Sequence, residues 1–267
     1  MQTTSLKRLW LALGLILIAS FGTLGFLGRE IHREAPPIPA AVVSAAGDVL
    51  YTKDDIQTGR QVYQSMGGQQ VGSIWGHGAY LAPDWSADWL HREAVTLLQV
   101  WTERVYRAAR FEDLTPGQQA VLKDRLKTEM RLNTYDPANG TITVSDDRAE
   151  AIARVAGHYV ALFGNGAELA GLREDYAIAN NAIPDQGRRE KLAAFFQWAA
   201  WATTTERPGQ DITYTANWPH EELVGNAPST DNVVWSIASI VLLIAGIGAL
   251  SWWHSARKEE PAPQAPA

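Results

Sequence analysis

Residues 9–28 read LWLALGLILIASFGTLGFLG, and residues 233–253 read VVWSIASIVLLIAGIGALSWW. Neither stretch contains a charged residue. A helix rises about 1.5 Å per residue, so roughly twenty residues cross the hydrocarbon core of a bilayer. Trp235, Trp252 and Trp253 lie near the two ends of the second stretch, where interfacial aromatic residues are expected. The sequence therefore predicts two transmembrane helices with one soluble domain between them.

The first stretch has a cleaved signal peptide as its alternative interpretation, because Lys7 and Arg8 precede it. Its apolar run is too long for such a peptide, and no small-residue cleavage site precedes Arg29, so we expect an uncleaved anchor. Arg257 and Lys258 follow the second stretch, and basic flanks of this kind place both termini in the cytoplasm. The predicted order is a cytoplasmic N-terminus (1–8), a transmembrane helix (9–28), an extracytoplasmic domain (29–231), a second transmembrane helix (232–253) and a cytoplasmic tail or linker rich in proline and alanine (254–267).

The composition of the 267-residue chain excludes several classes of function. A formal net charge of −6 argues against nucleic acid as a partner, because phosphates are bound by clustered lysines and arginines. The absence of cysteine from the sequence excludes disulfides, thiolate metal sites and covalently attached c-type haem. A mean hydropathy of −0.16 argues against a protein with many membrane spans.

Between the two apolar stretches, apolar residues recur at helical spacing. Residues that cap helix N-termini mark three of the expected starts, namely Asp84 or Ser86, Thr115 before a proline, and Ser145. Alternating apolar residues predict a short strand over 141–144. The expected helices cover residues 89–106, 115–132, 145–164 and 187–205.

The six histidines do not form a metal site of familiar spacing, because no two of them stand three or four residues apart. Neither apolar stretch contains an ionisable residue that could bind haem or carry protons. We also find no nucleophile–base pairing and no phosphate-binding loop in the sequence. The chain is therefore not expected to hold a complete catalytic centre.

One segment has an unusual composition, since residues 66–89 read MGGQQVGSIWGHGAYLAPDWSADW. Glycines at this density allow positive φ angles and a close approach of the backbone to another group. Backbone carbonyls and a tyrosine in such a loop can bind a hard cation such as Ca²⁺. A surface loop that folds on its own tryptophans is the alternative interpretation of the same residues.

Two motifs carry a resemblance to a known family. Residues 72–93 read GSIWGHGAYLAPDWSADWLHRE, and residues 217–226 read NWPHEELVGN, just before the second apolar stretch. Together they resemble the N-terminal region of quinol-dependent nitric oxide reductases. In that family the region is similar to the cytochrome c subunit of the two-subunit nitric oxide reductases. The resemblance implies a mainly α fold, in which two transmembrane helices flank a helical, cytochrome c-like extracytoplasmic domain with little strand.

The same resemblance implies what the glycine-rich segment does. The haem-attachment motif of the cytochrome subunit falls on residues 68–72, where both cysteines and the axial histidine are missing, so this chain alone is expected to bind no haem. The calcium ligands of the family fall on the backbone carbonyl of Gly78 and on Tyr80, which implies a Ca²⁺ at a subunit interface. Gly76, His77 and Trp85 are expected at that interface.

The implied function is that of a non-catalytic subunit or module of a quinol-dependent nitric oxide reductase in the inner membrane, with its main domain on the periplasmic side. It would dock on and stabilise a partner with many membrane spans that binds haem b and non-haem iron and reduces NO to N₂O. Because the sequence ends at Ala267, a split subunit and an N-terminal portion of a longer chain both remain possible. The alternatives are a free-standing membrane-anchored assembly or binding factor with the same fold, and a module of a related NO-dismutating enzyme.

Overall fold

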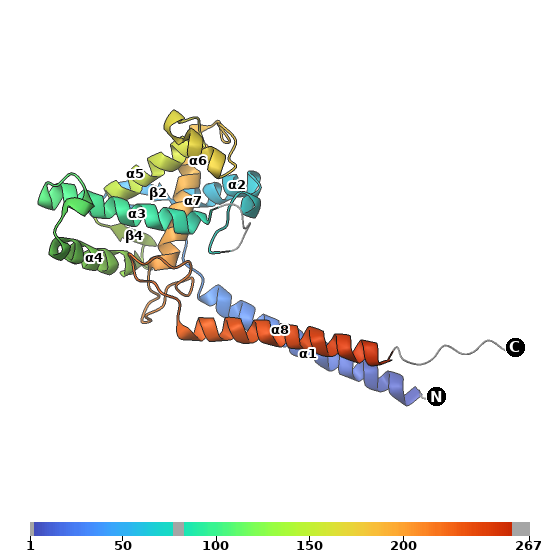
Figure 1. The fold of residues 1–267 in the computed structure, drawn as a ribbon. Helices are drawn as coiled ribbons and strands as arrows, with labels where there is room; N and C mark the ends of the chain where they lie inside the picture. The colour runs from blue at the N-terminus through green and yellow to red at the C-terminus, as the bar shows by residue number, and fades with distance from the viewer. Residues whose placement is uncertain (1–2, 77–82, 258–267) are drawn as a thin grey trace.

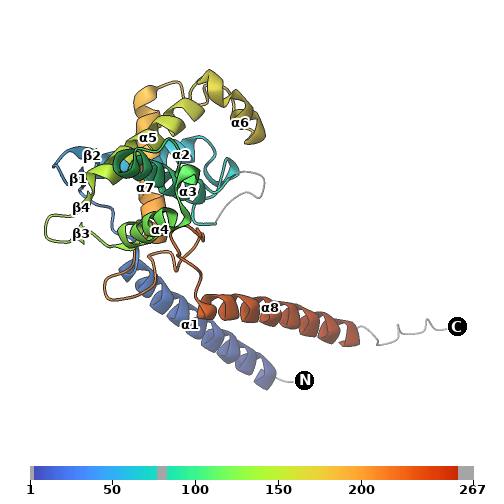
Figure 2. The same cartoon turned by 60° about the vertical axis from the view of Figure 1, so that its left-hand side comes forward.

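The computed structural model describes residues 3–76 and 83–257. Two long helices, α1 (Thr3–Arg33) and α8 (Thr230–Arg257), leave the same end of a helical domain and run away from it (Figures 1 and 2). Both are long and apolar enough to cross a membrane, over Leu6–Arg33 and Thr230–Ala256. Their most apolar windows are 0% buried, so these side chains face outward as lipid-facing side chains do. The structure therefore confirms two candidate transmembrane helices that flank a central domain.

The domain between these helices is mainly α-helical, as the sequence predicted. Helix α3 (Trp85–Trp101) continues into a short π-helix over Thr102–Tyr106, and short 3₁₀ turns lie at Gly68–Gln70, Phe111–Asp113 and Ala167–Leu169. In the described part of the domain the α-helices are α2 (Lys53–Ser65), α3 (Trp85–Trp101), α4 (Pro116–Arg131), α5 (Asp146–Leu162), α6 (Ala170–Asp175) and α7 (Gln186–Thr204).

The helix starts follow the predicted caps. The side chain of Asp84 accepts a hydrogen bond from the backbone of α3, and Ser145 does the same for α5. Thr115 forms a reciprocal capping box with Gln118 at the start of α4, where a proline occupies the first turn. Helix α3 begins at Trp85 rather than at the expected Trp89, because Asp84 is the residue that caps it.

A small sheet lies at one edge of the domain (Figure 2), and the sequence predicted only one of its strands. The strand order is β2-β1-β4-β3. The central pair, β1 and β4, is parallel, with Ala41 opposite Thr141. The outer pairs are antiparallel. The strands are β1 (Ala41–Ser44), β2 (Val49–Thr52), β3 (Tyr135–Asp136) and β4 (Thr141–Val144).

Helix α7 forms the centre of the core, and α2, α3 and α5 pack against it. All residues of α7 from Leu192 to Thr204 are buried. Helix α2 crosses α7 at Gly59, where a Cβ atom would lie 1.9 Å from the carbonyl oxygen of Lys191. Only glycine permits this close approach, and the crossing brings the end of α2 beside the aromatic residues of α7.

A buried ion pair joins α3 to α5. The Arg148 guanidinium donates to Glu93 over 2.7 Å, and the two side chains are 4% and 1% exposed. Glu93 also accepts a hydrogen bond from the Trp89 indole over 2.7 Å. A charge buried this deeply lowers the stability of the fold unless it is paired. The pair therefore fixes how α3 and α5 pack against each other.

Candidate functional site

The glycine-rich segment is closed by one carboxylate, that of Asp84. It accepts hydrogen bonds from the Ser73 hydroxyl over 2.7 Å and from the Gly76 backbone N–H over 2.6 Å. The Ser73 N–H donates to the carbonyl of Pro83 over 3.0 Å, and the Trp85 N–H donates to the carbonyl of Ser73 over 2.9 Å. The residue that caps α3 therefore also holds both ends of the loop together.

Gly72 lies where the loop touches the core. Its φ is +149°, and a Cβ atom there would lie 2.1 Å from the indole nitrogen of Trp85. The Tyr63 hydroxyl donates to the Gly72 carbonyl over 2.7 Å. Burial, with a smaller contribution from the Asp84 charge, raises the pKa of Tyr63 to about 12, so this hydroxyl keeps its proton and remains a donor.

Aromatic rings fill the interior behind residues 68–72. Trp85 stacks on Phe196 with ring centroids 5.4 Å apart, and Trp89 stacks on Tyr159 at 5.0 Å. Phe163 meets the Trp85 ring edge-on at 5.4 Å. A c-type haem in this place would need two cysteines and an axial side chain at the loop. The sequence has no cysteine, and the Cβ position of Gly72 lies directly against the Trp85 indole, so the residues present do not fit a covalently attached c-type haem.

The second motif, residues 217–226, folds around two asparagines beneath the end of α7. The Asn226 amide donates to the carbonyls of Thr203 and Pro219, each over 2.8 Å, and is fully buried. Asn217 accepts from the Thr213 N–H over 3.0 Å. This fixed loop leaves Trp218 50% exposed at its surface.

The two motifs meet in space although they are far apart in the sequence. A Cβ atom on Gly76 would lie 2.2 Å from the indole nitrogen of Trp218, so the backbone of one motif lies directly against the ring of the other. A second link joins His91 Nδ1 to Glu221 Oε2 over 2.9 Å. Trp75 anchors the loop to α7, because its indole donates to the carbonyl of Ala199 over 2.9 Å. We call the surface formed by Trp75, Gly76 and Trp218 the motif surface.

The motif surface lies where α1 and α8 join the domain. A cleft of about 510 Å³ runs between it and α1, and Leu27, Ile31 and Glu34 form the α1 side of that cleft. Glu34 pairs with Arg207, which also lines the cleft. On the other side of Trp218, a cleft of about 620 Å³ is bounded by the first turns of α8. Both helices thus present apolar side chains to the same indole.

The structure places the expected site residues in different surroundings. Gly76 lies on the motif surface, in a position that a partner can reach. Trp85, which we expected at an interface, is 0% exposed and stacked in the core, so its side chain has no surface to offer a partner. His77, Gly78 and Tyr80 lie outside the described residues. Trp218 was not singled out from the sequence, although its position in the second motif was a signal that could have found it.

The described residues give little support of their own to a calcium ion. In residues 3–76 and 83–257 no three histidine, aspartate or glutamate side chains cluster as metal ligands do. The carboxylate oxygens of Asp84 already accept hydrogen bonds from Ser73, Gly76 and Ala87. Ca²⁺ takes six to eight oxygen ligands, which include backbone carbonyls and waters as well as carboxylates.

One comparison identifies relatives of the chain. The family model for the cytochrome c-like domain of NorB, a nitric oxide reductase component, matches residues 39–220. The match begins just before β1 and ends inside the second motif, so it covers the domain between α1 and α8. The comparison with curated proteins returned no match.

Proposed function

The chain belongs to the family of NorB cytochrome c-like domains of nitric oxide reductase, and from this premise we propose that it is the non-catalytic membrane module of a quinol-dependent nitric oxide reductase. In this role it docks on the part of the enzyme that binds haem b and non-haem iron and reduces NO to N₂O, and it stabilises that part. Electrons then arrive from quinol in the membrane, and the domain itself carries none. The module sits in the inner membrane with its domain on the periplasmic side.

The motif surface is the observation that carries this proposal. It joins the two sequence motifs in one place, at the end of the domain from which α1 and α8 emerge. An exposed indole beside two outward-facing apolar helices is the kind of anchor that dominates protein interfaces, because aromatic residues bury much area at a small entropic cost. A helix bundle that packs against α1 and α8 would reach Trp218 at the same time.

We further propose that Gly78 and Tyr80 contribute oxygen ligands to a Ca²⁺ shared with the catalytic part. Support comes from the family resemblance and from the anchored position of neighbouring Gly76. Tyr80→Phe removes one ligand oxygen and keeps the ring, so the complex should weaken while the isolated domain unfolds as before. A calcium chelator should weaken the parent complex to a similar degree and the variant complex little further. Equal stability of both complexes, with and without chelator, would remove calcium from the proposal.

Quinol-driven NO consumption tests the proposed function. Membranes that contain the catalytic part should consume NO with a quinol donor when this chain is present and lose most of that activity when it is absent. If the chain is a free-standing assembly factor, the catalytic part matured in its presence should keep its activity after the chain is removed. A module of a dismutating enzyme would instead release N₂ and O₂ from NO without any added quinol.

A further inference from the structure

The segment between α7 and α8 lies where the two long helices join the domain (Figures 1 and 2). Within it, residues 213–218 form a loop that ends on Trp218, the exposed indole of the motif surface. We call residues 213–218 the coupling loop. Its backbone is bound from the side of α1 at Tyr214 and from the side of α8 at Ala216.

Arg207 connects the coupling loop to the end of α1. Its guanidinium pairs with Glu34, the residue that follows α1, and donates to the Tyr214 carbonyl over 3.0 Å. Glu34 extends the helix, because its backbone N–H donates to the Glu30 carbonyl over 3.0 Å. A displacement of the end of α1 is therefore transmitted to the loop at Tyr214.

Asn232 connects the same loop to the start of α8. Its side-chain amide donates to the Ala216 carbonyl over 3.0 Å. Its backbone N–H donates to the Ser229 hydroxyl over 3.3 Å, which is the bond of a residue that caps a helix start. Asn232 is thus fixed within α8, and its side chain holds the backbone of the loop.

The backbone of the coupling loop has a conformation that its own sequence does not favour. Ala216 and Asn217 have φ angles of +58° and +61°, in the left-handed region that residues with a Cβ atom seldom adopt. Asn217 donates its N–H to the Thr213 hydroxyl over 2.7 Å and accepts from the Thr213 N–H over 3.0 Å. Ala216 has no polar side chain, so it depends on backbone bonds such as the one from Asn232. Strain of this kind persists only where surrounding contacts impose it.

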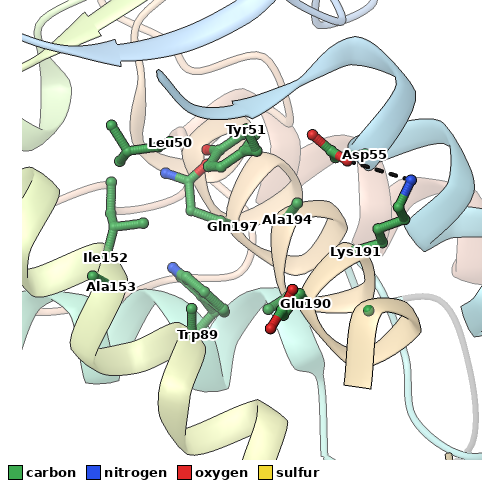
Figure 3. A pocket seen from close by; sticks show the side chains of 13 residues that line it. Leu50, Tyr51, Asp55, Trp89, Ile152, Ala153, Glu190, Lys191, Ala194 and Gln197 are labelled. Atoms are coloured by element: carbon green, nitrogen blue, oxygen red, sulfur yellow. Dashed lines mark ion pairs between the residues drawn. The ribbon is translucent and has the colours of Figure 1, made fainter. Parts of the chain in front are cut away.

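Helix α7 gives the coupling loop a fixed base. The Tyr214 ring packs on Trp201 near the C-terminal end of α7, with ring centroids 5.3 Å apart. Near the other end of α7, Lys191 pairs with Asp55 of α2 over 3.5 Å, beside an apolar pocket (Figure 3). Because the part of α7 between these contacts is buried, the loop is placed against a rigid part of the core.

We propose that the coupling loop makes α1, α8 and Trp218 one docking unit, in which Arg207 and Asn232 are positioning residues for the indole. A partner that packs against α1 and α8 then also selects the position of the indole that it covers. The partner that fits presents an apolar helix face within the membrane and a contact for an indole beside the membrane. The role of the partner rests on the proposed function, whereas the positioning of the loop is a property of this chain alone.

Hydrogen exchange of the full chain in lipid nanodiscs tests the positioning without any partner. Asn232→Ala removes the donor to Ala216, so the amides of residues 213–217 should exchange about 2- to 10-fold faster, while those of α3 and α5 keep their rates. Asn232→Asp should act in the same way, since it lacks the amide donor although its charge favours the start of α8. Asn139→Ala is the matched control, because Asn139 bonds only to Thr141 among the described residues, in the turn between β3 and β4. Unchanged exchange in both Asn232 variants, or faster exchange in Asn232→Ala alone, would overturn the positioning.

A double-variant cycle tests the same coupling in the complex. Asn232→Ala should weaken binding of the haem b protein about 2- to 10-fold when Trp218 is present. In a Trp218→Ala background it should cause no further loss, because Asn232 acts through the indole, and Arg207→Met should behave alike from the side of α1. Equal losses in both backgrounds would overturn the docking unit. If Trp218→Ala alone leaves binding unchanged, the docking proposal fails, and the exchange rates then decide whether Asn232 positions the loop.

Discussion

At the scale of single residues, Gly72 determines what the loop before α3 can accept. Its positive φ and the 2.1 Å approach of a Cβ atom to the Trp85 indole leave no room for any side chain. Gly72→Ala should lower the free energy of unfolding by about 3 kcal/mol, because backbone strain and overpacking act together. Thermal unfolding of the full chain in detergent measures the loss. Gly157→Ala is the control: nothing lies within 4 Å of its Cβ position in α5, so it should stabilise by about 0.5–1 kcal/mol. Equal effects of the two changes would contradict this view of the loop.

Trp218 is the single residue on which the docking proposal depends most. It is 50% exposed, so Trp218→Ala should change the unfolding temperature of the isolated chain only slightly. Its loss from an interface should cost about 2 kcal/mol or more of binding free energy, as for other aromatic hot spots. The amount of haem b protein that co-purifies with the chain at limiting concentration gives the affinity. Val121→Ala, at an exposed position on α4, should leave that amount unchanged.

At the scale of elements, the Glu93–Arg148 pair holds α3 against α5. Arg148→Met leaves the Glu93 carboxylate buried without its partner and should cost about 3–5 kcal/mol in the free energy of unfolding. Arg154→Met breaks ion pairs whose members are 36–44% exposed and should cost under about 1 kcal/mol. Chemical denaturation of the variants measures both losses.

A second change separates charge from shape at this pair. Adding Glu93→Gln to Arg148→Met removes the unpaired charge and keeps an acceptor for the Trp89 indole. Part of the lost stability should therefore return. A double variant that is less stable than Arg148→Met alone would show that packing, and not the buried charge, dominates.

The elements also show what the sequence could and could not predict. Helices α4, α5 and α7 lie within a few residues of their predicted bounds, because their starts are marked by local caps such as Ser145. The strand pairing could not be predicted in this way, since β1 and β4 are four-residue strands a hundred positions apart that gain their partners only in the fold. Helix α2 was not predicted either.

The candidate site, too, could be predicted from the sequence only in part. The two motifs could be recognised from the sequence, and Gly76 lies exposed on the motif surface, where its place at an interface with a partner stays a prediction. The contact between Gly76 and Trp218 is tertiary, and no local pattern records it. Trp85 was misplaced because an aromatic residue after a glycine-rich loop suits a surface as well as a core, and only the packing of α7 decides between them.

At the scale of the whole molecule, the two long helices determine the topology. They leave one end of the domain together, so the N-terminal end of α1 and the C-terminal end of α8 should share one side of the membrane (Figure 1). Protease added to spheroplasts should digest residues 29–231 and spare a tag placed after Ala267. Cleavage of that tag in intact spheroplasts would contradict the topology, and lysed spheroplasts provide the control in which the tag is cut.

The most direct test of the docking proposal is the haem content of the complex purified through a tag on this chain. Membranes from cells that express the enzyme would be solubilised mildly, and the reduced-minus-oxidised spectrum of the purified material recorded. We expect haem b absorption that co-migrates with the chain, and no covalent haem stain on its own band in a denaturing gel. A chain that purifies without haem b, under conditions in which the catalytic part stays active in the same extract, would contradict the proposal that it is a module of the reductase.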